Sequence, residues 1–193
     1  MRVIAGTARG RPLQAPRGTA TRPTGDRVRE AVFDMLSSMD AIEGATVLDL
    51  FAGSGALGIE CLSRRAERAV FVDHHADALT AVHHNLQVLG EVAARATVIR
   101  ADSLAYSAAA PSFDLVLADP PYDFDRWDEL LERLHSRTGL LVAEVAFEKG
   151  PSQWSPGPGW ETVKVKRYGG TVVCIAKPLP APPGTVVAEE GQT

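Results

Sequence analysis

Cysteine and long apolar runs are both scarce in this chain of 193 residues. The two cysteines, Cys61 and Cys174, lie far apart in the sequence, which argues against a disulfide framework and predicts two buried thiols in a reducing compartment. No apolar run is long enough to span a bilayer. Residues 1–6 begin with a basic residue but have no apolar core behind them, so we expect no signal peptide, no membrane attachment and a cytoplasmic location.

Metal-ligand patterns and internal repeats are also missing. The histidines include two adjacent pairs, His74–His75 and His83–His84, and neighbours on a helix do not share a face. No Cys or His completes a tetrahedral set at a familiar spacing, so we expect no metal site. His74 could line a ligand pocket, and the other histidines are expected on a solvated helix surface. A chain of 193 residues with 45% hydrophobic content is expected to form one globular domain with a real core.

Positive charge is concentrated at the N-terminus, although the whole chain carries −4. Residues 1–29 contain seven arginines against the single acid Asp26, which gives this stretch +6 and leaves −10 for the remainder. An arginine-rich segment ahead of an acidic body predicts a surface that contacts RNA phosphates and stacks on bases. The alternative is a solvated basic terminus without a special role. The arginines concerned are Arg2, Arg9, Arg11, Arg17, Arg22, Arg27 and Arg29.

Apolar runs alternate with helical patterns along most of the chain. We expect strands at 45–51, 68–73, 96–101, 113–118 and 140–147, and helices that begin at Pro23-Thr24 or cover 76–89 and 125–136. Two β-rich runs at 160–167 and 171–176 predict an antiparallel hairpin, and 2–5 with 11–15 predict a smaller one. The expected fold is α/β, a seven-stranded mostly parallel sheet with an antiparallel terminal hairpin and a small N-terminal β-hairpin. We expect a hairpin and basic arm at 1–18, a main domain at 19–177 and a flexible Pro-rich tail at 178–193.

The tetrapeptide Asp119-Pro120-Pro121-Tyr122 stands where a predicted buried strand ends and a loop opens. A nucleobase amine is a poor nucleophile, because its lone pair is delocalised into the ring. A carboxylate and a rigidly held proline carbonyl that both accept its N–H bonds can pull the nitrogen toward a tetrahedral shape. Tyr122 offers a face on which an extruded base can stack. The motif therefore indicates chemistry on such an amine, and the alternative is an ordinary Pro-containing turn.

A glycine-rich segment links the strand at 45–51 to a helical pattern. Gly53, Gly55 and Gly58 fit the G-x-G-x-x-G pattern, and Asp73 follows Gly53 by twenty residues, where an acid grips a ribose diol. Alternatively, Asp73 caps the helix that begins near Ala76. The residues expected against a cofactor are Phe51, Ala52, Gly53, Ser54, Gly55, Asp73 and His74.

Two cofactors offer a ribose to such a site, a nicotinamide dinucleotide and S-adenosylmethionine. Asp49, just before the glycines, suits the α-amino group of S-adenosylmethionine, or it is a buried acid bonded to loop amides. Asp102 could accept from the adenine amine with Ser103 as a further contact, or the pair could cap a helix. Acids at four successive strand ends, Asp49, Asp73, Asp102 and Asp119, favour S-adenosylmethionine. A dehydrogenase would also need a second nucleotide-binding half, for which the chain has no room.

Several motifs taken together resemble those of the RsmD family, the bacterial 16S ribosomal RNA (guanine-N2) methyltransferases. They are RVIAG at 2–6, RGR at 9–11, RPTxDRVREA at 22–31, LDLFAGSGALG at 48–58 and DPPY at 119–122, in the expected order over residues 1 to about 177. In the family the acid after the second strand is usually glutamate, whereas this chain has the shorter Asp73.

The resemblance implies a class I S-adenosylmethionine-dependent methyltransferase fold of the Rossmann-like type, with residues 19–177 as the methyltransferase domain. It implies S-adenosylmethionine as cofactor and a guanine of 16S rRNA, presented on an assembling 30S subunit, as substrate. Asp119, Pro120, Pro121 and Tyr122 would then hold the guanine while its amine attacks the sulfonium methyl in one in-line displacement. We expect a monomer.

Two other functions remain open. One is an amine methyltransferase that acts on adenine N6 of DNA or RNA, or on a glutamine amide. The lack of a large target-recognition domain argues against the DNA version. The other is a non-catalytic RNA-binding assembly factor, against which the intact Asp49, Gly53, Gly55 and Asp119 argue.

Overall fold

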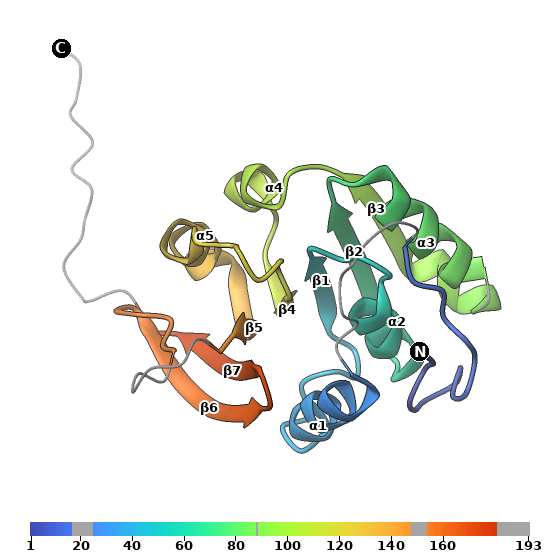
Figure 1. Ribbon diagram of the computed structural model, residues 1–193, viewed down its shortest axis with the longest axis horizontal. Helices are drawn as coiled ribbons and strands as arrows, with labels where there is room; N and C mark the ends of the chain where they lie inside the picture. The colour runs from blue at the N-terminus through green and yellow to red at the C-terminus, as the bar shows by residue number, and fades with distance from the viewer. Residues whose placement is uncertain (17–24, 88, 148–153, 181–193) are drawn as a thin grey trace, which may run out of the picture.

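Seven strands form one sheet in the order β3-β2-β1-β4-β5-β7-β6 (Figure 1). This computed structural model describes residues 1–16, 25–87, 89–147 and 154–180. The strands are β1 Thr46–Leu50, β2 Arg68–Asp73, β3 Ala96–Arg100, β4 Phe113–Ala118, β5 Thr138–Ala146, β6 Trp160–Tyr168 and β7 Thr171–Pro178. The predicted strands are confirmed, with boundaries that differ by at most two residues at either end.

Strands β1 to β5 run parallel, and β7 is antiparallel to both of its neighbours, β5 and β6. The chain builds outward from β1 to β2 and β3, and then returns to add β4 on the other side of β1. Ligands of open α/β sheets bind beyond the carboxyl ends of the strands at such a reversal. The fold therefore points to the ends of β1 and β4 as the place for a site.

Helices cover both faces of the sheet. They are α1 Asp26–Ser37, α2 Ala56–Ser63, α3 Ala76–Gln87, α4 Ser103–Ala109 and α5 Trp127–Leu134, with 3-10 turns at Gly90–Arg95 and His135–Arg137. Helices α1, α2 and α3 lie on one face, and α4 with α5 on the other (Figure 1). Among the described residues, no helix combines the length and the apolar character that crossing a bilayer requires.

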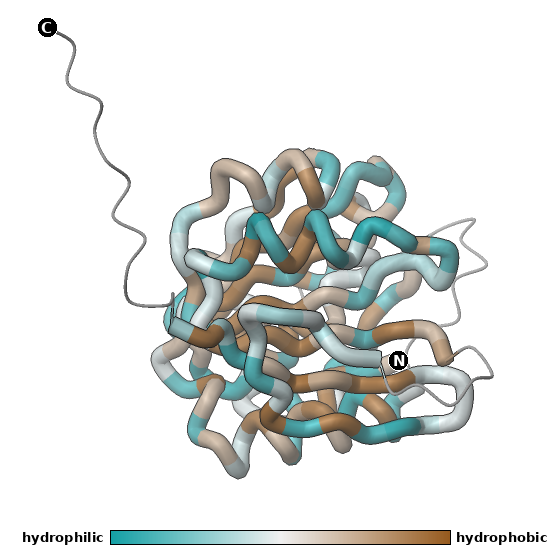
Figure 2. The backbone as a smooth tube through the Cα atoms, turned by 90° about the vertical axis from the view of Figure 1, so that its left-hand side faces the viewer, coloured by the Kyte–Doolittle hydropathy of each residue, from teal (hydrophilic) through white to brown (hydrophobic). Residues whose placement is uncertain are grey.

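Alternating side chains of each strand supply two apolar layers. Leu115 and Leu117 of β4 face the layer beneath α1 to α3, whereas Val116 and Ala118 face α4 and α5. The tube in Figure 2 shows the apolar strands in the interior and polar helix segments outside. The two cysteines are both buried and reduced, as predicted.

The first helix departs from the prediction at its start. It begins at Asp26, with Gly25 at the N-cap position and no side-chain capping hydrogen bond. Pro23 and Thr24, where the helix was expected to begin, lie outside the described residues. Helix α4 was not predicted as an element, because residues 103–109 carry only one large aliphatic side chain, Leu104.

The N-terminal segment, residues 1–16, doubles back on itself and packs on α2. Arg2 forms an antiparallel bridge with Pro12, which confirms the small hairpin. The buried carboxylate of Glu60 accepts hydrogen bonds from the backbone N–H groups of Ile4 at 2.7 Å and Ala5 at 2.9 Å. Gly6 has a φ of +82°, and a Cβ there would overlap with the Ser63 carbonyl, so only glycine fits. The segment is therefore held against the domain rather than extended into solvent.

Candidate active site

A cavity of about 490 Å³ opens at the carboxyl ends of β1, β2, β4 and β5. Its lining draws on the glycine loop, the tetrapeptide after β4, the N-terminal segment and α1. Of the predicted site residues, it includes Asp49, Phe51, Ala52, Gly53, Ser54, Asp73, His74, Asp119, Pro120, Pro121 and Tyr122. Three of the four predicted strand-end acids thus converge on one cavity.

Strand register explains why the acids converge. Ala118 of β4 pairs with Leu50 of β1 and with Ala143 of β5, so Asp119 comes one residue beyond this level. Side chains of a strand alternate between the two faces of the sheet, so residues two positions apart lie on the same face. Asp49 therefore lies on the face of Val47, and Asp119 on the face of Leu117, which is the face covered by α1 to α3. Both acids therefore project from the same face of the sheet at its carboxyl edge.

The glycine loop is fixed by hydrogen bonds from its surroundings. Asp73 accepts from the Gly53 N–H at 2.9 Å, and the Asn85 side-chain amide donates to the Ser54 carbonyl at 2.8 Å. A Cβ on Gly58 would overlap with the Phe71 ring and lie 3.0 Å from Asp49 Oδ2, so α2 can pack this closely only with glycine there. Gly55, the N-cap residue of α2, does not itself line the cavity.

Asp49 is 1% exposed and accepts a hydrogen bond from the Gly58 N–H at 2.9 Å. Burial raises the pKa of this carboxyl well above its usual value, the Gly58 hydrogen bond opposes this, and the nearby Asp119 and Asp73 add to the rise. Asp49 is therefore a buried acid bonded to a backbone amide, as in the alternative noted for it, but the amide lies in the first turn of α2 and not in the loop. Since the anion is poorly stabilised here, a ligand cation in the cavity would favour the charged form.

Asp73 both lines the cavity and bonds the backbone just before α3. It lines the cavity, and its second oxygen accepts from the His75 N–H at 2.9 Å, just before α3 begins at Ala76. His74 is exposed at the rim, with its Nδ1 3.9 Å from Asp73. A carboxylate oxygen that accepts one N–H still has a lone pair for a ligand hydroxyl. The pair is thus placed to meet a ribose without losing the contacts that hold the loop.

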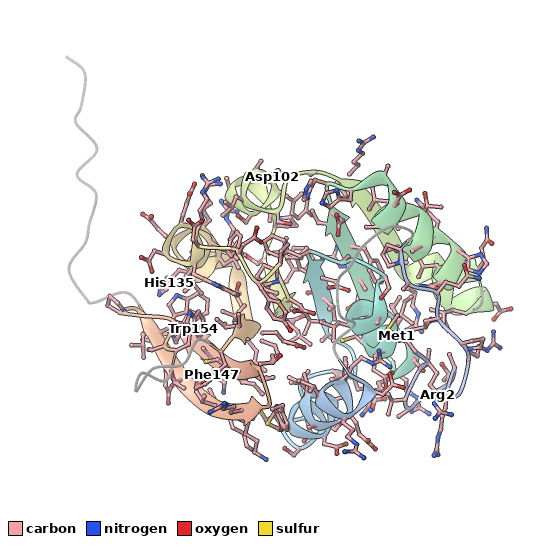
Figure 3. The ribbon with its side chains drawn as sticks, in the orientation of Figure 1. Met1, Arg2, Asp102, His135, Phe147 and Trp154 are labelled. Carbon is pink, nitrogen blue, oxygen red and sulfur yellow. The ribbon has the colours of Figure 1, made fainter. Side chains whose placement is uncertain are left out.

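The structure does not bring Asp102 and Ser103 to the cavity. Asp102 is the N-cap of α4, where its side chain accepts from the Ala105 N–H at 2.8 Å. It lies at the start of that helix in Figure 3 and is exposed to solvent. Ser103 is buried beneath it. The helix-cap alternative is the one the structure favours for this pair.

A second cavity of about 250 Å³ adjoins the first and is rich in aromatic side chains. It shares Pro120, Pro121, Tyr122, Glu144 and Val145 with the larger cavity. Its aromatic residues are Tyr122, Phe124, Trp127, Phe147 and Trp154, of which the last two are labelled in Figure 3. Tyr122 is 63% exposed, so its ring is open to an incoming group.

Glu144 and the aromatic cavity were not predicted from the sequence. Glu144 on β5 is 3% exposed and lines both cavities, as a further acid at the end of a strand. The available signal was an acid inside the otherwise apolar run at 140–147. The aromatic cavity combines residues more than thirty positions apart, and nothing in their spacing brings Tyr122 and Trp154 together.

The predicted RNA-contacting arginines divide into two groups. Arg2, Arg9, Arg11 and Arg27 are exposed, whereas Arg29 is 1% exposed and lines the larger cavity. The prediction of a surface phosphate contact is therefore wrong for Arg29, because α1 turns this side chain inward. Arg17 and Arg22 lie outside the described residues.

Known proteins share this sequence and fold. Ribosomal RNA small subunit methyltransferase D of Haemophilus influenzae is 35% identical over 175 residues, 88% of this chain and 89% of that protein. The protein of the same name from Escherichia coli K12 is 34% identical over 165 residues, 80% of this chain and 81% of that one. The structure of the Escherichia coli protein yhhF superposes with a TM-score of 0.79 at 30% identity and covers 92% of this chain and 97% of its own.

These findings confirm a class I S-adenosylmethionine-dependent methyltransferase with a Rossmann-like fold. The acid-lined cavity at the ends of β1, β2 and β4 lies where that fold holds its ligand. The model of the family described as Conserved hypothetical protein 95 matches residues 1–177. The chain belongs to this family, the RsmD family.

Proposed function

We propose that this protein methylates the exocyclic N2 amine of a guanine in 16S rRNA, on the assembling small ribosomal subunit. The observation that carries the proposal is the position of Asp119 in the same cavity as Asp49 and Asp73, with the exposed ring of Tyr122 at its mouth. A methyl donor and an amine acceptor can meet at that point. The rRNA specificity comes from the similarity to the small subunit methyltransferases D.

The residues present suit S-adenosylmethionine, which supplies an activated methyl group on a sulfonium when bound. Asp73 would hold the ribose hydroxyls and Asp49 the amino group. The three carboxylates favour a ligand with positive charge, since the pKa of Asp49 is raised by burial, by Asp119 and by Asp73. With Asp49, Asp73, Asp119 and Glu144 against the single guanidinium of Arg29, the described lining is mainly acidic, whereas a pyrophosphate site is mainly cationic.

On the acceptor side, Asp119 and the Pro120 carbonyl would accept the two N–H bonds of the guanine amine. This orients the nitrogen lone pair toward the donor and stabilises the positive charge that develops on nitrogen in the transition state. Tyr122 would stack on the extruded base. The neighbouring aromatic cavity adds further ring faces of the kind on which unpaired RNA bases stack.

The exposed arginines of the N-terminal segment would bind the surrounding RNA. Arg2, Arg9 and Arg11 belong to a segment that Glu60 and buried side chains hold against α2. A fixed basic surface positions phosphates relative to the cavity better than an unanchored arm, because a fixed segment loses less conformational entropy when RNA binds. The substrate would place the enzyme in the cytoplasm, where it would act as a monomer.

A methylation assay with labelled cofactor tests the proposal. Undermethylated 30S subunits, free 16S rRNA and DNA would be offered in parallel, with Asp119→Asn enzyme as the blank. We expect label in the ribosomal RNA, most in 30S subunits, and none in DNA. Label in DNA alone would support an adenine methyltransferase instead, and RNA binding without any transfer would support a non-catalytic assembly factor.

A further inference from the structure

The larger cavity contains a buried cation, the guanidinium of Arg29. It is the sole arginine or lysine among the described residues that line the cavity, and it is 1% exposed. It extends from the first turn of α1, while the acids of the lining come from strand ends. Arginine is almost never buried to this degree without partners that offset its desolvation.

Its protein partners satisfy only one end of the guanidinium. Nη2 donates to the Arg2 carbonyl and to Asp26 Oδ1 at 3.1 Å. Nε and Nη1 have no hydrogen-bond partner among the described residues. Burial lowers the pKa of Arg29, with Asp26, Glu60 and Glu144 opposing the effect. The N–H groups of a buried, charged guanidinium on Nε and Nη1, which point in different directions, are thus left for a ligand.

None of the nearby acids, Asp26, Glu60 and Glu144, accepts a hydrogen bond from Nε or Nη1. Both oxygens of Glu60 already accept backbone N–H groups, from Ile4 and Ala5, and one also accepts from Arg64 at 2.8 Å. Asp26 is bonded to Nη2 and is 48% exposed at its other side. A ligand anion that enters the cavity is therefore the group that would complete the coordination of Arg29.

We propose that Arg29 binds the α-carboxylate of the cofactor's amino-acid group through N–H groups that the protein leaves unpartnered. Hydrogen bonds between a guanidinium and a carboxylate are charge-assisted and stronger than those between neutral groups. The amino-acid group is a zwitterion, and the cavity offers charges of both signs, Asp49 for its ammonium and Arg29 for its carboxylate. An RNA phosphate is the competing anion, but a side chain that is 1% exposed is poorly accessible to a polynucleotide backbone.

The test compares two ligands by calorimetry on the full chain. S-adenosylhomocysteine carries the amino-acid group, and 5′-methylthioadenosine lacks it but keeps the adenosine. Arg29→Met removes the guanidinium, Arg29→Lys keeps the charge without the planar set of donors, and Arg65→Met is a matched control, since the Arg65 side chain is 71% exposed. We expect Arg29→Met to weaken S-adenosylhomocysteine about 30-fold and Arg29→Lys about 10-fold. Methylthioadenosine should bind both variants as it binds the parent, and Arg65→Met should bind both ligands normally.

The proposal is overturned if Arg29→Met weakens both ligands equally, since Arg29 would then only support the fold. It is also overturned if the affinity for S-adenosylhomocysteine is unchanged while RNA binding falls, since the anion would then be a phosphate. A measurement on the parent protein does not depend on the variants folding. Decarboxylated S-adenosylhomocysteine should bind about 30-fold more weakly than S-adenosylhomocysteine, and equal affinities would contradict the proposal.

Discussion

Burial disfavours the charged form of the Asp49 carboxyl relative to a carboxylate in water, and this makes the free energy of unfolding depend on pH. Because its pKa is raised in the folded state, the folded protein keeps a proton that the unfolded chain has released at the same pH. The free energy of unfolding therefore falls as pH rises from the ordinary value of 3.8 through the raised pKa. Above that window, Asp49 destabilises the ligand-free protein by a constant amount.

Asp49→Asn should accordingly stabilise the ligand-free protein by about 1 kcal/mol or more at neutral pH, since an amide oxygen can still accept from Gly58. The same change should weaken cofactor binding. Thermal unfolding from pH 4 to pH 8, with and without S-adenosylhomocysteine, checks both effects. If the ligand-free variant were no more stable than the parent at pH 8, the burial cost assigned to Asp49 would be wrong.

Asp119 should affect methyl transfer far more than cofactor binding. Asp119→Asn retains size but turns one oxygen acceptor into a donor, which opposes the guanine amine. We expect turnover to fall at least about 100-fold, as when one preorganised electrostatic group is lost, and S-adenosylhomocysteine affinity to change little. Asp123→Asn, an exposed neighbour, is the matched control. Undiminished turnover in Asp119→Asn would remove this residue from the mechanism.

Among the secondary-structure elements, those with continuous apolar runs were predictable and those that depend on long-range contacts were not. β2 and β4 match their predicted ranges to the residue, because buried strands consist almost wholly of apolar side chains. The acids at strand ends were also visible in the sequence. Strand order is set in space, however, so the sequence did not show that β5 and Glu144 lie beside β4.

The inward orientation of Arg29 has a similar cause. An arginine in a helix is expected at the surface, and the Arg2 carbonyl that receives it belongs to a segment 27 residues away. Asp102 illustrates the opposite error. Its place after a strand suggested a cofactor contact, but Asp102 is the N-cap of the short helix α4. The apolar pattern of that helix is weak, so the helix and its cap were not predicted from the sequence.

Glu60 connects α2 to the N-terminal segment, and its removal should loosen that segment. Its buried carboxylate accepts from Ile4, Ala5 and Arg64. Glu60→Gln would place amide hydrogens against one of these N–H groups and should cost about 1–3 kcal/mol of unfolding free energy. Hydrogen exchange at Ile4 and Ala5 should accelerate in the variant. Unchanged exchange there would mean that the buried Val3, Ala8 and Leu13 hold the segment without Glu60.

The molecule as a whole is acidic but presents a basic N-terminal surface. Attraction between that surface and RNA should appear in the salt dependence of binding. Removing an arginine that binds one phosphate should reduce the slope of log K against log salt by about 0.7 to 0.9. We expect Arg9→Gln with Arg11→Gln to lower the slope by about 1.5 in total, and Arg65→Gln, at an exposed position just after α2, to leave it unchanged. An unaltered slope in the double variant would contradict an RNA-contacting role for this surface.

The proposed reaction requires that the cavity lined by Tyr122 receives the exocyclic amine of a guanine in the bound RNA. The most direct measurement is the identity of the methylated nucleoside. Undermethylated 30S subunits would be treated with labelled cofactor, and the 16S rRNA digested to nucleosides and separated. Label in N2-methylguanosine, absent when Asp119→Asn enzyme is used, is the predicted result. Label in N6-methyladenosine, or in any methylated nucleoside other than N2-methylguanosine, would contradict the proposed reaction.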